Sequence, residues 1–210
     1  MRAAAAAVLL LAGCTAPIAS TEQTASSLLQ YAAGRQQQQV VRTAAQASDV
    51  LRVKPCPGAT FGRGEVTSVL QTATFDAAGQ VTGGAWQERV PVQGCSPVVA
   101  LNVAVVVRGP GRVEATPLLP GDTHADAVLQ ADGSSAIRML LSAAPECQPV
   151  FANAAYVGPD GAPVEGRRQG WRERWTIISC ARRAVFTVHF TPDLHGGTYL
   201  RVNPTETVEG

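Results

Sequence analysis

The second half of the chain repeats the first half. The segment WQERVPVQGC, residues 86–95, aligns with WRERWTIISC, residues 171–180, at a constant offset of 85 residues. Further along, TPLLPGDT at 116–123 aligns with TPDLHGGT at 191–198, now at an offset of 75. Because Trp and Cys are rare residue types, a chance match of both at one spacing is improbable. Self-similarity of this kind indicates a duplicated structural unit.

Each copy has the pattern of a small α+β unit. Around the second Trp, the residues Trp171, Glu173 and Trp175 share one side of a segment with the period of two that a β-strand requires. The fold class is therefore expected to be α+β, with two pseudo-symmetric units of helix and antiparallel strands at 27–120 and 121–210, each carrying one disulfide. Besides the two Trp strands, we expect helices at 37–51 and 134–144 (capped by Ser134 or Ser135), strands at 65–75, 98–107, 151–157 and 184–190, and hairpin loops at 76–79 and 158–161. The Val-rich stretch 98–107 is apolar enough to be covered on both faces.

The N-terminus has the features of an export signal. One cation, Arg2, precedes an apolar run at 3–12, which is too short to cross a bilayer as a helix because a span takes about 20 residues. The tetrapeptide Leu11-Ala12-Gly13-Cys14 resembles the lipobox of bacterial lipoproteins. An ordinary cleaved signal peptide that happens to end in Cys is the alternative.

The lipobox resemblance implies a lipid anchor. Residues 1–13 would be removed as the signal peptide, Cys14 would be acylated, and 14–26 would form a polar tether. Two or three acyl chains anchor a protein far more firmly than one. Thr15 follows the cysteine where an Asp would retain the protein, so the resemblance implies delivery to the outer membrane, facing the periplasm.

Four other cysteines remain for disulfides, namely Cys56, Cys95, Cys147 and Cys180. An even number in an exported protein favours two bridges, because the periplasm is oxidising. Four cysteines allow three pairings. The repeat favours pairing within each unit, across separations of 39 and 33 residues, over crossed pairing of Cys56 with Cys147 and Cys95 with Cys180. No C-x-x-C pair and no Cys/His cluster with zinc spacing occurs in the sequence, so we expect no metal site and no cofactor.

The charge balance argues against nucleic-acid binding. Seventeen basic and sixteen acidic residues leave a formal net charge of +1, whereas such binding requires a concentrated basic surface. Hydrophobic residues make up 46% of the chain, which is enough for a core.

The W-x-E-R … C segment, followed by a strand and TPDLHGGT, resembles a module of uncharacterised bacterial envelope proteins. The resemblance is clearest over 171–199 and extends to about half of the mature chain when the first copy is included. The first copy departs from it by having Val90 where the second has Trp175. It implies fold and localisation, and no activity.

Two Trp/Glu pairs are the candidate binding residues: Trp86 with Glu88, and Trp171 with Glu173. Each pair shares one strand face, so a groove floored by indole and edged by carboxylate is possible. The favoured alternative is structural, with the Trp in the core near a disulfide and the Glu at a rim or paired with Arg.

The histidines carry no recognisable catalytic arrangement. His124 and His195 each follow an Asp by two residues, but they occupy different positions in the aligned repeat, so exposed turn residues are expected. His189 is expected to be a solvent-facing strand residue. Because the sequence contains no nucleophile elbow, phosphate loop or H-E-x-x-H motif, no catalytic residue is assigned.

These features favour a non-catalytic envelope lipoprotein that acts as a binding module or an accessory protein. Its expected partners are the membrane, through the lipid anchor, and other envelope proteins, without nucleic acid. The alternatives are a periplasmic hydrolase and a small-molecule or lipid carrier, whose sites would be assembled in space and invisible in sequence.

Overall fold

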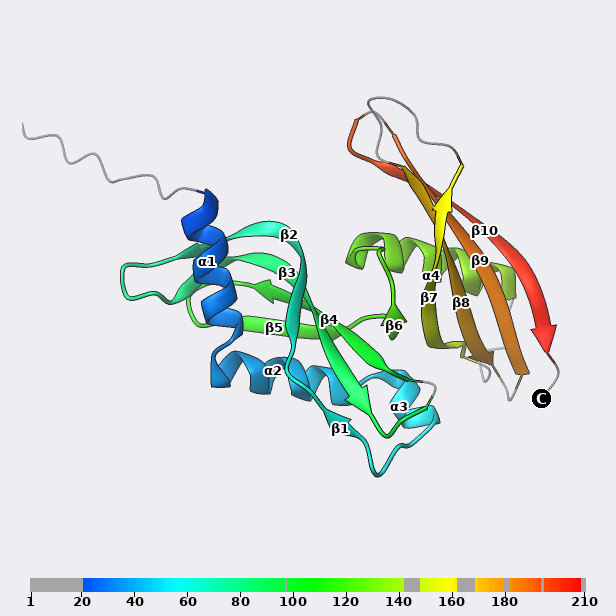
Figure 1. The fold of residues 1–210 in the computed structure, drawn as a ribbon, viewed down its shortest axis with the longest axis horizontal. Coiled ribbons are helices and arrows are strands. Elements are labelled where there is room, and N and C mark those ends of the chain that lie inside the picture. The colour runs from blue at the N-terminus through cyan, green and yellow to red at the C-terminus, as the bar shows by residue number, and fades with distance from the viewer. Residues whose placement is uncertain are drawn as a thin grey trace, which may run out of the picture.

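A computed structural model describes residues 21–96, 98–141, 148–161, 169–179, 182–193 and 195–208. It is a mixed α+β fold built mainly from antiparallel strands, as the sequence predicts. Two five-stranded sheets lie side by side, with three helices beside the first sheet and one beside the second (Figure 1). The expected signal peptide, Cys14, Cys147 and Cys180 all lie outside the described residues.

The first sheet is organised around its longest strand, β3. This strand pairs with β4 along one edge and with β1 and β2 along successive parts of the other edge. The elements of this half are α1 (Thr21–Ala32), α2 (Arg35–Gln46), α3 (Asp49–Val53), β1 (Thr60–Phe61), β2 (Glu65–Phe75), β3 (Val81–Gln93), β4 (Ala100–Val107) and β5 (Val113–Pro117).

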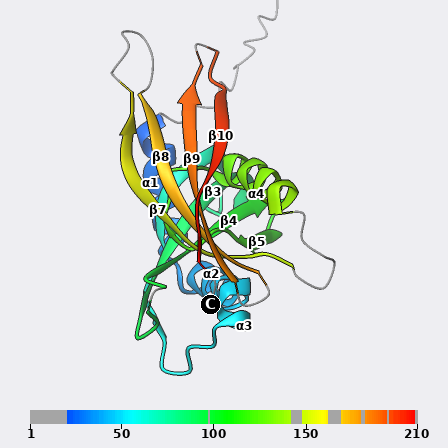
Figure 2. The same cartoon turned by 90° about the vertical axis from the view of Figure 1, so that its right-hand side faces the viewer.

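The second sheet is a four-stranded antiparallel meander with a short parallel strand at one edge. Its elements are β6 (Gly121–Asp122), α4 (Ala127–Leu141), β7 (Val150–Asp160), β8 (Gly170–Ser179), β9 (Arg182–Pro192) and β10 (Thr198–Val208). Helix α4 covers one side of this sheet, as Figure 2 shows. In the first half three helices precede five strands, of which β2 to β5 form a meander, and in the second half α4 precedes the meander of β7 to β10.

Helix boundaries differ from the expectation. The stretch expected as one helix at 37–51 forms α2 and α3, with a break at 47–48. Helix α1 begins inside the expected tether at 14–26 and continues to Ala32. It packs against the rest of the chain through Leu28 and Ala32, which are buried on one side of the helix.

The start of α4 was misplaced by the sequence interpretation. The helix begins at Ala127, and Asp126 caps it, since its Oδ1 accepts the N–H groups of Val128 and Leu129 at 2.9 and 3.0 Å. Ser134 and Ser135, expected as caps, lie inside the helix. The sequence interpretation relied on serine as the capping residue and overlooked the equally good aspartate eight residues earlier.

The strands agree more closely with the sequence pattern. Every residue of β4 except Val106 is buried, which confirms that this strand is covered on both faces. The hairpin at 76–79 is present, with Gly79 at φ 76°. The second predicted hairpin loop begins later than expected, because β7 continues through Asp160.

Two hydrophobic cores are present. The first is built around Trp86, Val90 and the β4 valines, and the second around Trp175, Phe186 and Phe190. Ala152 from β7 belongs to the first core, so the two halves are packed against each other.

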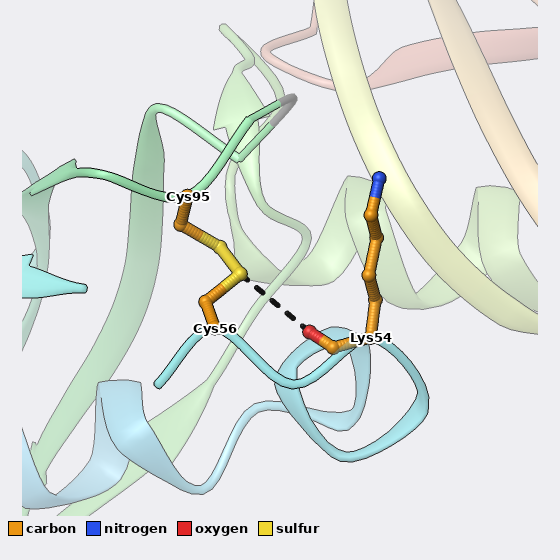
Figure 3. Close-up of a disulfide and its surroundings, with 3 residues drawn as sticks. All are labelled: Lys54, Cys56 and Cys95. Carbon is orange, nitrogen blue, oxygen red and sulfur yellow. Dashed lines mark hydrogen bonds between the residues drawn. A yellow bond between two sulfur atoms is a disulfide. The ribbon is translucent and has the colours of Figure 1, made fainter. Parts of the chain in front are cut away.

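One disulfide, between Cys56 and Cys95, links the segment after α3 to the segment after β3 (Figure 3). The two Cα atoms are 5.4 Å apart, and Cys56 Sγ lies 3.6 Å from the Lys54 carbonyl oxygen. The within-unit pairing predicted for the first copy is confirmed. The equivalent pairing of Cys147 with Cys180 stays a prediction.

Candidate functional site

The first Trp/Glu pair is buried in the core. Trp86 and Glu88 are both 0% exposed. The indole Nε1 of Trp86 donates to Glu88 Oε1 at 2.9 Å, and Gln37 Nε2 from α2 donates to the same oxygen at 3.0 Å. The favoured structural alternative is therefore confirmed for Trp86, which lies in the core, and this pair forms no open groove. The expected location of the Glu at a rim or against Arg is wrong.

The second oxygen of Glu88 has no hydrogen-bond partner among the described residues. It faces Gly64, where an added Cβ would come within 2.7 Å of it. Burial raises the pKa of the Glu88 carboxyl, and the hydrogen bonds from Trp86 and Gln37 oppose this rise only in part. Burial, together with the charge of Glu88, also raises the pKa of Tyr31.

The second pair has the same local geometry but a fuller set of partners. Trp171 Nε1 donates to Glu173 Oε1 at 2.9 Å, which matches the first pair. Glu173 is 0% exposed and accepts five hydrogen bonds in total, so both of its oxygens are satisfied. The other four donors are Trp175 Nε1 (2.9 Å), Thr123 Oγ1 (2.8 Å) and the backbone N–H groups of His124 (2.7 Å) and Ala125 (3.1 Å).

These bonds hold the segment 122–126 against the second sheet. The residues just before this segment are fixed as well, because Asn102 Nδ2 donates to the carbonyl oxygens of Leu119 and Gly121 at 2.7 and 3.1 Å. Arg89 from β3 then reaches Asp122 at 2.9 Å. The buried carboxylate and amide therefore determine where the side chains of this segment stand.

A polar cleft of about 450 Å³ lies between the segment 122–126 and the first sheet. Strands β2 and β3 form one wall, and the segment that Glu173 holds forms the other. The lining residues are Thr67, Ser68, Gln87, Arg89, Asp122, Thr123, His124 and Asp126.

Two residues that line this cleft each have a buried polar atom that lacks a partner within the described part of the chain. Gln87 is 3% exposed and its Oε1 accepts no hydrogen bond, while the Ser68 Oγ is buried without a partner. The two residues are neighbours across the β2–β3 pairing. Buried polar groups are normally hydrogen-bonded, so an adjacent unpartnered pair on residues that line a cleft indicates a place where a ligand or ordered water completes the network.

The histidines are distributed over unrelated positions. The ring of His124 stacks on Tyr156 with 4.0 Å between centroids, and His195 lies in a turn whose Asp193 accepts its backbone N–H at 2.8 Å. His189 is a strand residue on the outer side of β9, as expected, but its side chain is only 16% exposed, and Nδ1 lies 2.7 Å from Asp160 Oδ2. Across the described ranges, no three His, Cys, Asp or Glu residues are grouped so as to hold a metal ion.

Two residues that line the cleft, Gln87 and Arg89, are not among the predicted binding residues. Gln87 and Arg89 lie within the repeated W-x-E-R segment, and their alternation with Trp86 and Glu88 could have placed them together on the opposite face. Gln37 belongs to a glutamine run that reads as a solvated, low-complexity stretch, yet it is 2% exposed.

No family model, curated protein or solved structure matches this chain. None of the helices in the described ranges has both the length and the apolar composition needed to span a bilayer.

Proposed function

We propose that this chain is a non-catalytic binding protein of the bacterial envelope, and that the cleft between its sheets holds a hydroxyl-rich, uncharged ligand such as a carbohydrate. The observation that carries the proposal is the adjacent pair of unpartnered polar atoms, Gln87 Oε1 and Ser68 Oγ, on two residues that line the cleft.

The chemistry of the lining supports hydroxyl groups as the ligand. Gln87 Oε1 and the Asp122 carboxylate are acceptors, Arg89 is a donor, and Ser68 Oγ is both. A sugar hydroxyl both donates and accepts, so neighbouring hydroxyls match alternating donors and acceptors. The Arg89–Asp122 ion pair already balances its own charges, so the cleft offers no unbalanced cation for a strongly anionic ligand.

The proposal is tested by titrating the ¹⁵N-labelled chain with maltose and with N-acetylglucosamine, using sodium phosphate as the charged comparison. We expect the amide shifts of residues 67–68, 87–89 and 122–124 to move with at least one sugar. Gln87→Met should abolish the response, while Gln71→Met, an exposed change on β2, should leave it intact. The absence of any localised response to either sugar at millimolar concentration would contradict the proposal.

We propose further that the protein is held in the envelope by acylation at Cys14, in the outer membrane and facing the periplasm. The support is the lipobox sequence and the confirmed disulfide, which fits an oxidising compartment. Labelled palmitate should be incorporated into the wild-type chain and not into Cys14→Ala. Incorporation into neither chain, or into both, would contradict the anchor.

We also propose that the two halves, 27–120 and 121–210, derive from a duplication. The support is the sequence repeat, the matching helix-and-meander order, and the same 2.9 Å Trp-to-Glu hydrogen bond in both copies. Equivalence of the units predicts a second disulfide between Cys147 and Cys180. Peptide mapping without reduction tests this pairing, and any peptide joining Cys147 to a first-half cysteine would contradict it.

A further inference from the structure

The face of the second sheet opposite α4 carries a cluster of arginines. This outer face can be followed through the strand register, because residues paired across an antiparallel sheet lie on the same side. Helix α4 packs on the other side, where Gly133 approaches Trp175. Two adjacent rows cross the outer face, Gly158–Arg172–His189–Arg201 and Asp122–Ala155–Arg174–Thr187–Asn203.

Cations outnumber acids in these two rows. Arg174 and Arg201 are exposed, and the Arg172 side chain is 42% exposed. One acid, Asp160, lies against the first row, 3.6 Å from Arg172 and 2.7 Å from His189. The other acid, Asp122, stands at the far edge of the second row, where Arg89 pairs with it.

An exposed aromatic residue extends the same face. Tyr199 lies two residues before Arg201 on β10, on the same side of the strand, and it is 70% exposed. Tyrosine is enriched where proteins meet the membrane–water interface, because its ring is apolar and its hydroxyl is polar. Arginine binds phosphate groups through its fork of donors.

We propose that the outer face of the second sheet docks onto a membrane surface that contains anionic phospholipids. The arginines bind lipid phosphates, and Tyr199 enters the interface between headgroups and acyl chains. The two rows lie on a broad sheet face, and such a face has the shape to contact an extended anionic surface. The inference does not require the cleft to bind a ligand or Cys14 to be acylated.

The test uses the unacylated chain from Thr15 onward, which retains every described residue, and measures co-sedimentation with large vesicles. The vesicles are pure phosphatidylcholine or phosphatidylcholine with 30 mol% phosphatidylglycerol. The variants are Arg174→Gln/Arg201→Gln and Tyr199→Ser. The matched control is Arg108→Gln/Arg112→Gln, which removes the same charge from the exposed β4–β5 hairpin.

Binding is expected with phosphatidylglycerol vesicles, with little to phosphatidylcholine alone. Each outer-face arginine removed should lower the partition coefficient about fivefold, and added salt should weaken binding. Tyr199→Ser should lower binding at high salt as well, since its contribution is not ionic. Circular dichroism shows whether each variant is folded, and all the substituted positions are exposed.

Three results would overturn the proposal. The first is no preference for the anionic vesicles. The second is an equal loss of binding in the Arg108→Gln/Arg112→Gln control, which would indicate general charge attraction. The third is binding to dextran sulfate that depends on Arg174 and Arg201 in the absence of vesicle binding, which would make the partner a soluble polyanion.

Discussion

Glu88 and Glu173 occupy the same position in the repeated W-x-E-R sequence, yet their surroundings differ. Each accepts a hydrogen bond at 2.9 Å from the Trp two residues before it, and each is 0% exposed. Glu173 receives four further bonds spread over both oxygens. Glu88 receives one more, on the oxygen already used, and its Oε2 has no partner within the described residues.

The difference follows from two local changes in the repeat. Where the second copy has Trp175, which donates to Glu173, the first copy has Val90, which cannot donate. Residues 123–125 also donate hydrogen bonds to the Glu173 carboxylate, whereas only Gln37 adds a hydrogen bond to that of Glu88. The same W-x-E-R segment thus anchors a segment that lines the cleft in one half of the chain, and leaves a buried acid with one unpartnered oxygen in the other.

The largest expected effect is for Glu173→Gln. The amide of glutamine has one accepting oxygen where the carboxylate has two. Its NH₂ group can only donate, so it would face at least one N–H group without accepting a hydrogen bond from it. Leaving at least one buried donor unsatisfied, and removing the charge that strengthens all five bonds, should lower the free energy of unfolding by about 3–5 kcal/mol. Urea unfolding measures this loss.

The exposed acid Glu114 offers the matched control, because it is 59% exposed in its ion pair with Arg108. Glu114→Gln should change the free energy of unfolding by less than about 1 kcal/mol. A loss for Glu173→Gln as small as that of the control would mean that the five hydrogen bonds do not hold the second unit together.

A somewhat smaller loss is expected for Gly133→Ala. This glycine lies inside α4, where an added Cβ would come within 2.6 Å of the Trp175 ring. Alanine favours helix by about 1 kcal/mol over glycine, but the buried indole has no room to move, so the net cost should be about 2 kcal/mol. Thermal unfolding monitored by Trp fluorescence reports it. An increase in the melting temperature would show that Trp175 can shift, and that its bond to Glu173 is adjustable.

Gly64→Ala probes the corresponding contact in the first unit. The new methyl group would meet Glu88 Oε2 at 2.7 Å and Val41 Cγ1 at 3.2 Å, so a loss of about 1–2 kcal/mol is expected. Combined with Glu88→Ala, which removes the carboxylate, most of this loss should disappear. Gly58→Ala is the control, because nothing lies within 4 Å of its added Cβ. Strict additivity of Gly64→Ala and Glu88→Ala would contradict direct contact as the cause.

The sequence could predict the alternating strands and the doubly covered β4, because each depends on local periodicity. It could also predict the first disulfide, which depends on the number of cysteines and their place in the repeat. The partners of Glu88 and Glu173 could not be predicted in this way. Gln37 lies 51 residues from Glu88, and Thr123 lies 50 residues from Glu173, so both contacts depend on tertiary packing. The rule that buried carboxylates pair with cations pointed to Arg, whereas indole, amide and backbone N–H groups satisfy these two.

The smallest effect is expected for Glu88→Gln, and its sign should depend on pH. Burial raises the pKa of Glu88 above its ordinary value of 4.5, so the folded chain binds a proton more tightly than the unfolded chain does. The carboxyl contributes most to stability while it is protonated in both states, below about pH 4.5. This contribution is lost as the pH rises from there through the raised folded-state pKa. Gln cannot ionise, so the stability of Glu88→Gln relative to wild type should increase over that interval and then level off. Urea unfolding of both chains between pH 4 and pH 8 measures the difference, with Glu65→Gln, an exposed change on β2, as the control. A difference that stays constant with pH would show that folding does not shift the pKa of Glu88. A difference that shifts in favour of wild type as the pH rises would show that folding stabilises the charged form, as for an acid whose oxygens are all satisfied.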